Sequence, residues 1–201
     1  MKKTLLSLAF AGVAALGAPA QAASIDFEDL VLGTVYNVGG SLATNGITVT
    51  PKDFTFSNGT TFGGGFALVE NLGNAGGSGQ DLQVNNILLD FALGNVTDLS
   101  FAFGEFGGNL NIDVNGDFRN FQDFADIDGL TIGGALVSVV NGFGNDQGMV
   151  SLAGPISSFA IGGQELYIDD LRATAVIPLP AGVALLGGGL MLLAGVGRRR
   201  T

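Results

Sequence analysis

The residues of this chain that could do chemistry are carboxylic acids. Its 201 residues include 18 Asp and Glu and 8 Lys and Arg, but neither His nor Cys. This composition excludes Ser-His-Asp and Cys-His catalysis and His-ligated zinc or iron. Two acids are enough for glycoside hydrolysis, but in such an acidic chain some pair always has a suitable separation. We therefore expect that the protein is not an enzyme and has no catalytic residue.

Acids concentrate in two short segments, IDFEDL at residues 25–30 and YIDDL at residues 167–171. These segments resemble the first and last strands of jelly-roll modules similar to carbohydrate-binding domains. The resemblance implies that the two terminal strands pair and that a structural calcium ion is held by an acid from each. It implies Glu28 and Asp169 as the first ligand candidates, with Asp26 and Asp170 next.

A physical argument points the same way. Pairing of the two segments would bring five carboxylates together, with Arg172 as the only local cation. Like charges at short range disfavour ionisation unless a cation intervenes, and calcium takes about six to eight oxygen ligands. The alternative is that these acids face solvent at strand ends, with Asp29 or Asp170 accepting hydrogen bonds from turn amides.

Two further acidic clusters have simpler interpretations. Asp113 and Asp117 are spaced as at the start of a calcium loop, but Phe118 stands where such a loop needs glycine. The intervening Asn115-Gly116 is typical of a type I′ hairpin turn, which is the interpretation we favour. The other cluster is interpreted as a solvated loop and consists of Asp123, Asp126 and Asp128.

The elements that would position these acids are β-strands. Gly accounts for 34 residues, and turn residues separate short runs of Val, Ile, Leu and Phe. Leu99, Phe101 and Phe103 alternate with small or polar residues, as in a strand with one buried face. We predict an all-β fold, an antiparallel two-sheet sandwich of the jelly-roll type.

The predicted strands cover most of the region between the two ends of the chain. They are residues 25–30, 46–50, 54–57, 66–70, 82–84, 87–92, 98–103, 110–114, 135–140, 149–153, 156–161 and 166–173. The glycine-rich stretch 73–79 between two of them is expected to be a mobile loop.

The first 22 residues are typical of a secretory signal peptide. Lys2 and Lys3 form a basic start, residues 5–16 are apolar, and Ala20-Gln21-Ala22 fits the small-residue cleavage pattern. We expect cleavage near Ala22, which leaves an acidic, glycine-rich β-sandwich domain over residues 23–174 and a separate C-terminal segment over residues 175–201.

The C-terminal segment has three parts. A proline-containing motif is followed by an uncharged apolar stretch, and a helix from Ile177 to Gly197, which includes both, would be roughly 30 Å long and so could cross a membrane. The arginine cluster after it would stay on the cytoplasmic side. The motif is Ile177, Pro178, Leu179, Pro180 and Ala181, and the cluster is Arg198, Arg199 and Arg200.

This pattern resembles the PEP-CTERM sorting signals of exported Gram-negative proteins, in the variant with Val-Pro-Leu-Pro-Ala. Here Ile177 replaces the valine, and the glutamate of the commoner Pro-Glu-Pro form is absent. The resemblance implies a transient anchor in the inner membrane. It also implies processing by an exosortase, a membrane-embedded cysteine transpeptidase, and delivery to the cell surface or extracellular matrix. The alternative is a plain membrane anchor that is never cut.

The charge of the domain excludes some partners. Residues 23–174 contain all 18 acids but only Lys52, Arg119 and Arg172 as bases, a net charge of about −15. Such a surface repels nucleic acid and attracts divalent cations. We therefore expect no nucleic-acid partner and, as cofactor, structural calcium alone.

Two functions remain open from the sequence. One is a non-enzymatic surface or matrix protein, and the other is a module that binds surface or matrix polysaccharide. Sugar-binding platforms depend on exposed aromatic rings, but the chain has no Trp and only two Tyr. We expect the exposed rings to be Phe62, Phe106, Phe118 and Phe143.

Overall fold

The computed structural model describes residues 22–141 and 147–175. The expected signal peptide, apart from Ala22, and the sorting motif, apolar stretch and arginine cluster all lie outside the described residues, as does Phe143. Within the described residues, no helix is long and apolar enough to cross a membrane.

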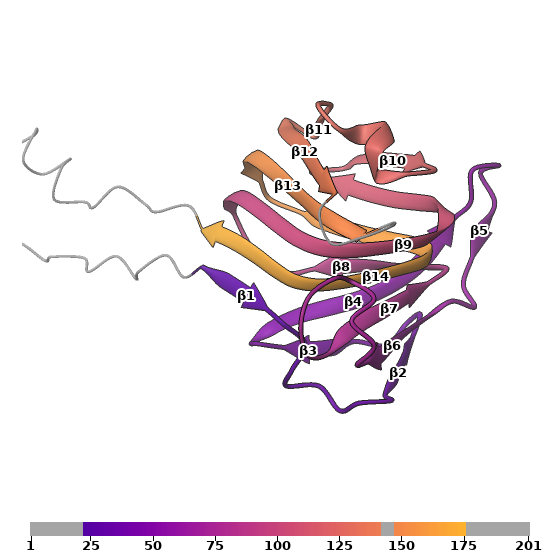
Figure 1. The fold of residues 1–201 in the computed structure, drawn as a ribbon. Coiled ribbons are helices and arrows are strands. Elements are labelled where there is room, and N and C mark those ends of the chain that lie inside the picture. Colours follow the sequence, from indigo (N-terminus) through magenta and orange to yellow (C-terminus); the bar gives the residue numbers. More distant parts are fainter. Residues whose placement is uncertain (1–21, 142–146, 176–201) are drawn as a thin grey trace, which may run out of the picture. The chain divides into compact units, whose positions relative to one another are not determined.

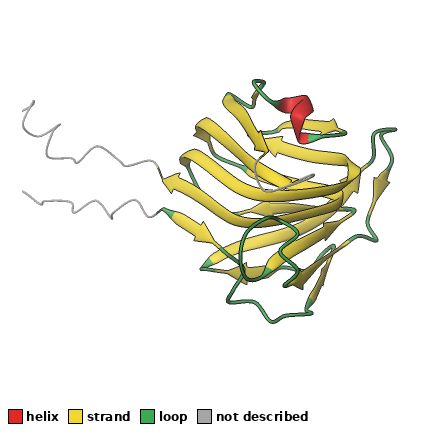
Figure 2. Ribbon diagram, in the orientation of Figure 1, coloured by secondary structure: helices red, strands yellow, loops and turns green. Residues whose placement is uncertain are grey.

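Strands make up most of the described chain, and the prediction of an all-β fold is confirmed (Figure 2). In chain order the elements are β1 (Ala23–Ile25), β2 (Val35–Asn37), β3 (Leu42–Thr44), β4 (Ile47–Thr55), β5 (Thr61–Phe62), β6 (Phe66–Glu70), β7 (Asp81–Asn85), β8 (Ile87–Phe91), β9 (Val96–Val114), β10 (Asp117–Phe121), the short 3-10 helix η1 (Phe124–Ile127), β11 (Thr131–Ile132), β12 (Ala135–Asn141), β13 (Gln147–Ile156) and β14 (Phe159–Ala175).

The sheet is built on its two longest strands, β9 and β14. They run antiparallel along their whole length, from Phe159 opposite Val114 to Ala175 opposite Val96. Strands β13 and β10 pair with the other edge of β9, and β8, β7 and β1 pair with the other edge of β14. Among the described residues, 14 strands join one antiparallel sheet in this way.

The β9–β14 ribbon folds back on itself. An extended strand from Phe101 to Val114 would span about 40 Å, yet the ring of Phe101 lies 5.9 Å from that of Phe159, the residue paired with Val114. Register shifts between Gly163 and Leu166 accompany the curvature of both strands, which is visible in Figure 1. The two halves of the ribbon therefore face each other across one core.

Phenylalanine rings fill the space between the facing halves. Phe124, on η1, packs against Phe101, Phe103 and Phe121 with ring centroids 6.0, 4.3 and 5.5 Å away. Leu99, Phe101 and Phe103 are all buried, so the predicted buried face of this strand is confirmed.

Several predicted strand boundaries are wrong. The strands predicted at 46–50 and 54–57 lie mostly in one strand, β4, and those predicted at 156–161 and 166–173 lie mostly in one strand, β14.

Two further errors have local reasons. The strands predicted at 98–103 and 110–114 are one strand, β9, because the glycines and Asn109 between them let the paired chain bend without leaving the sheet. The strand predicted at 25–30 ends at Ile25, because Phe27 adopts a φ of 57° and the Leu30 amide donates to the Phe27 carbonyl at 3.1 Å. Residues 26–30 therefore form a turn.

Replacement of a core ring tests this packing. Phe159 is buried against Phe91 and Phe101. We expect Phe159→Ala to lower the free energy of unfolding by about 3–5 kcal/mol, since the cavity cannot close fully. Phe118→Ala, at a ring that is 39% exposed, serves as the control and should change it by less than about 0.5 kcal/mol. Denaturant unfolding measures both, and equal effects would contradict the folded-back ribbon.

Candidate functional site

Three neighbouring strands place acidic side chains in one row on the face of the sheet opposite the core. Glu70 on β6 is paired with Asp81 on β7. Ile168 on β14 is paired with Leu82, so Asp169 follows beside Asp81. Leu82 and Ile168 point into the core, and side chains alternate along a strand. The three acids therefore share the other face.

The loop between β6 and β7, residues 71–80, covers this row, and Figure 1 shows it arching in front of the sheet. Asp81 anchors the loop, because its Oδ2 accepts hydrogen bonds from the amides of Asn74 at 2.7 Å and Ala75 at 3.2 Å. Gln147 on β13 also holds the loop, since its Nε2 donates to the backbone carbonyls of Gly73 at 3.1 Å and Asn74 at 2.7 Å.

A second set of contacts ties the loop to the turn after β1. The side-chain Nε2 of Gln80 donates to the backbone carbonyls of Phe27 at 3.1 Å and Leu30 at 3.2 Å. The backbone N–H of Gln80 donates to Glu28 Oε1 at 2.5 Å. The last of these contacts brings the Glu28 carboxylate to the acidic row.

Close approach accounts for several glycines at this site. A Cβ added at Gly77 would overlap Asp169 Oδ2, and one added at Gly79 would overlap Glu28 Oε1. On β9, a Cβ at Gly104 would overlap the Asn74 carbonyl oxygen. The glycines predicted to make a mobile loop thus allow the loop backbone to lie directly on two carboxylates and on the sheet.

Burial and repulsion act together on these acids. Only 1% of Asp81 and 2% of Asp169 is exposed. Burial raises the pKa of Asp169 to about 7, and the charges of Asp170, Asp81 and Glu28 add to this, while a hydrogen bond from the Asp170 amide opposes it. Burial and the charge of Asp81 likewise raise the pKa of Glu70. The site therefore disfavours the negative charges that it concentrates.

Two oxygens of the row are buried without a hydrogen-bond partner, Asp81 Oδ1 and Glu70 Oε2. Such atoms are costly, because water has been removed and nothing has replaced it. Within the described residues, however, no three acidic side chains already converge into a metal-binding group.

The structure separates the four acids that the sequence singled out. The first and last described strands pair as expected, but through residues 23–25 and 171–173, so of the two acidic segments only Ile25 and Leu171 lie opposite each other. Glu28 and Asp169 come to the same cluster, where the charge of Glu28 helps to raise the pKa of Asp169.

Asp26 and Asp170 are bonded elsewhere. Asp26 Oδ1 accepts a hydrogen bond from the Glu28 amide at 3.3 Å, within the turn. Asp170, with a φ of 49° at a bulge of β14, forms an ion pair with Arg172 at 3.3 Å.

Asp29 accepts hydrogen bonds from Thr44 Oγ1 at 2.6 Å and from the Asn45 amide at 2.7 Å. Burial opposes ionisation of Asp29, but these bonds outweigh it and lower the pKa. The alternative role considered for Asp29, bonding to a turn amide, is confirmed.

Sequence reasoning missed Asp81 and Glu70. Glu70 precedes the glycine-rich loop and Asp81 follows it. The alternation of polar Asp81 and Gln83 with apolar Leu82 and Val84, which are buried, can be seen in the sequence. What was not visible is that β7 lies between β6 and β14, which aligns these acids with Asp169.

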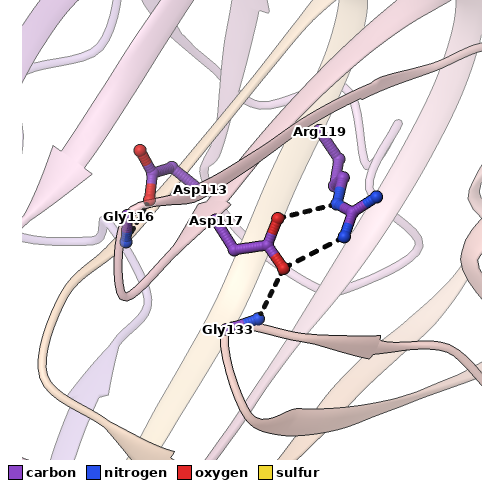
Figure 3. A network of polar contacts seen from close by, with 5 residues as sticks. All are labelled: Asp113, Gly116, Asp117, Arg119 and Gly133. Carbon is purple, nitrogen blue, oxygen red and sulfur yellow. Dashed lines mark hydrogen bonds and ion pairs between the residues drawn. The ribbon is translucent and has the colours of Figure 1, made fainter.

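The segment from Asp113 to Asp117 is a hairpin, as predicted. Asn115 and Gly116 have φ values of 55° and 82° between β9 and β10, and Asp113 Oδ1 accepts the Gly116 amide at 2.9 Å. Figure 3 shows Asp117 held by Arg119, with Nε and Nη2 at 2.7 and 3.1 Å, and by the Gly133 amide at 3.0 Å. Both acids therefore have roles in the turn.

The acidic cluster near η1 also has structural roles. Asp123 and Asp126 form a capping box on η1, in which Asp123 Oδ1 accepts the Ala125 amide at 2.7 Å. Asp128 Oδ1 accepts the Val139 amide at 2.8 Å. These acids shape the backbone around η1.

Three of the four rings expected to be exposed are so, with Phe62, Phe106 and Phe118 at 42%, 46% and 39%. Phe106 meets Tyr167 edge to face, with ring centroids 5.5 Å apart. Tyr167 lies two residues before Asp169 on the same face of β14, and its hydroxyl accepts a hydrogen bond from Gln83 Nε2 at 2.8 Å. This gives one small aromatic surface beside the covered acids.

Comparisons with protein families, with curated proteins and with solved structures found no match to this chain.

The seat of the loop can be tested at Gly104. We expect Gly104→Ala to lower the free energy of unfolding by about 1–3 kcal/mol, because the added methyl group displaces Asn74. Hydrogen exchange at the Asn74 and Ala75 amides should accelerate. Gly107→Ala on the same strand is the control, since its nearest neighbour is the exposed Glu165 side chain at 3.2 Å. Unchanged protection in Gly104→Ala would contradict the described contact.

The hairpin gives a pH prediction. Hydrogen bonds from Arg119 and then from the Gly133 amide hold the pKa of Asp117 below its ordinary value of 3.8. A lowered folded-state pKa means that this contribution to stability is complete above pH 3.8 and is lost as the pH falls. In an NMR titration, Arg119→Gln should raise the Asp117 pKa, while Lys52→Gln, whose partner is Asp90, should leave it unchanged. The opposite order would refute the pairing.

Proposed function

We propose that the protein is a non-enzymatic cargo that is exported, held in the inner membrane, processed by an exosortase-type enzyme and delivered to the cell surface or extracellular matrix. The observation that carries the proposal is the three-part C-terminal pattern of motif, apolar stretch and arginine cluster. The strands run from Ala23 to Ala175, between the two predicted signals, as a separate cargo domain requires.

The covered acids support a role without catalysis. Asp81 and Asp169 are the most deeply buried carboxylic acids among the described residues. With 1% and 2% of these side chains exposed, neither carboxylate is open to a glycoside, and a general acid must touch the bond that it cleaves.

The finer fold assignment belongs to this proposal. We infer a jelly-roll-like sandwich of two sheets, in which the folded β9–β14 ribbon supplies strands to both layers. The facing of Phe101 and Phe159 and the pairing of β1 with β14 support it.

A second candidate function is binding of surface or matrix polysaccharide. The edge-to-face pair of exposed Phe106 and half-buried Tyr167 favours it, because sugars bind through the faces and edges of aromatic rings next to polar groups. Gln83 supplies such a group beside the pair.

The export route can be tested on the protein recovered from cells that produce an exosortase. Mass spectrometry should find an N-terminus near Ala23 and a C-terminus near residues 177–181. In cells without the exosortase, the C-terminal segment should remain. Recovery from the cytosol with both ends intact would refute the proposal.

The polysaccharide function has its own test. In a pull-down on a set of neutral and acidic polysaccharides, Phe106→Ala should lose binding and Phe118→Ala should keep it. Retention no greater than that of albumin on every polysaccharide would remove this candidate and leave the export proposal untouched.

A further inference from the structure

The acidic cluster under the loop lacks positive charge. The described residues include three bases, and each is paired with an acid elsewhere: Lys52 with Asp90, Arg119 with Asp117 and Arg172 with Asp170. Four acids without a basic partner nevertheless interact at the cluster, namely Glu28, Glu70, Asp81 and Asp169. No described side chain can neutralise it.

Asp81 carries the specific observation. Its Oδ2 is saturated by the two loop amides, while its Oδ1 is buried with no partner in a side chain that is 1% exposed. A buried carboxylate oxygen without a donor needs either a proton or a cation, since removal from water costs several kcal/mol for an unpaired charge. Asp81 and Asp169 are neighbours across β7 and β14, so one cation can serve both.

We propose that Asp81, Asp169 and Glu28 bind one calcium ion beneath the loop of residues 71–80. This ligand set differs from the one implied by the sequence, because Asp81 takes the place of Asp26 and Asp170. Glu70 adds negative charge behind Asp81 without being needed as a ligand. The site does not depend on the export of the protein.

The chemistry of the donors selects calcium. All are oxygens, and the chain contains no His or Cys to favour a transition metal. The carboxylates come from the turn after β1, from β7 and from β14, and the backbone of the loop lies against them at Gly77 and Gly79. Calcium accepts such irregular sets of about six to eight oxygens, whereas magnesium demands a nearly ideal octahedron.

Binding requires only small movements. Glu28 is on an exposed turn, and its carboxylate is held by a single described bond, to the Gln80 amide. Gly77 and Gly79 leave room for the carboxylates directly under the loop. A bound ion would draw the Glu28 carboxylate toward Asp81 and Asp169. The three carboxylates would then converge on the ion, which they do not do in its absence.

Calorimetric titration of the full-length protein with calcium, after treatment with chelator, tests the site. We expect one saturable site per chain, a higher thermal midpoint in calcium than in chelator, and weaker binding of magnesium. Tb³⁺ should compete with calcium and emit on excitation of tyrosine. Tyr167→Phe should weaken that emission while calcium still binds, because the other tyrosine, Tyr36, is on β2.

Variants assign the ligands. Asp81→Asn and Glu28→Gln should each weaken calcium binding at least about tenfold, the scale on which metal sites respond to altered ligation. Asp98→Asn makes the same change of charge at an exposed position on β9 and should bind as the parent does. If Asp81→Asn fails to fold for loss of the loop anchor, Glu28→Gln still decides, because Gln keeps an oxygen for the Gln80 amide.

Three results would overturn the site. The first is an unchanged thermal midpoint with no saturable calcium binding, which would mean that protons neutralise the acids. The second is parental affinity in both ligand variants, and the third is an equal loss of affinity in Asp98→Asn. Each of these leaves the export proposal standing, since that proposal is tested by the processed ends of the chain.

Discussion

The long antiparallel pairing of β9 with β14 is the interaction on which the rest of the domain depends. Every other described strand joins one of these two directly or through one or two intervening strands. Because the ribbon folds back, the same pair of strands supplies both walls of the core, and Phe101 meets Phe159 across it. Loss of this pairing would separate the strands attached to β9 from those attached to β14.

A bulge in β14, separate from the bend, shapes the acidic site. At Asp170 the backbone enters the left-handed region and the register of β14 shifts. The buried positions change there from Leu166 and Ile168 to Leu171 and Ala173, so the parity of the inward side chains is reversed. Asp169 lies next to this bulge, on the face away from the core, where the loop covers it. The bulge that reverses the inward positions therefore follows directly after the buried carboxylate.

The sequence predicted the features that depend on neighbours along the chain. Alternation gave the buried faces of Leu99 to Phe103, and Asn115-Gly116 gave the hairpin. It failed where a distant partner decides the outcome. The continuity of β9 depends on β14, and the alignment of Asp81 with Asp169 depends on β7 lying between β6 and β14. The glycines were ambiguous for the same reason. From the sequence alone, a glycine that allows close approach to a distant side chain, such as Gly77 against Asp169, cannot be told from one that makes a loop flexible.

The pairing of Ala23 with Ala173 has a mechanical consequence. The chain enters and leaves the domain side by side, on two antiparallel strands at one place. Tension applied between the two ends would therefore pull on the β1–β14 hydrogen bonds in the unzipping geometry, in which they break one after another. In the shear geometry they would all bear the force together. Strand β1 would separate from β14 while the remaining strands stay paired. The force would then act on the turn that carries Glu28.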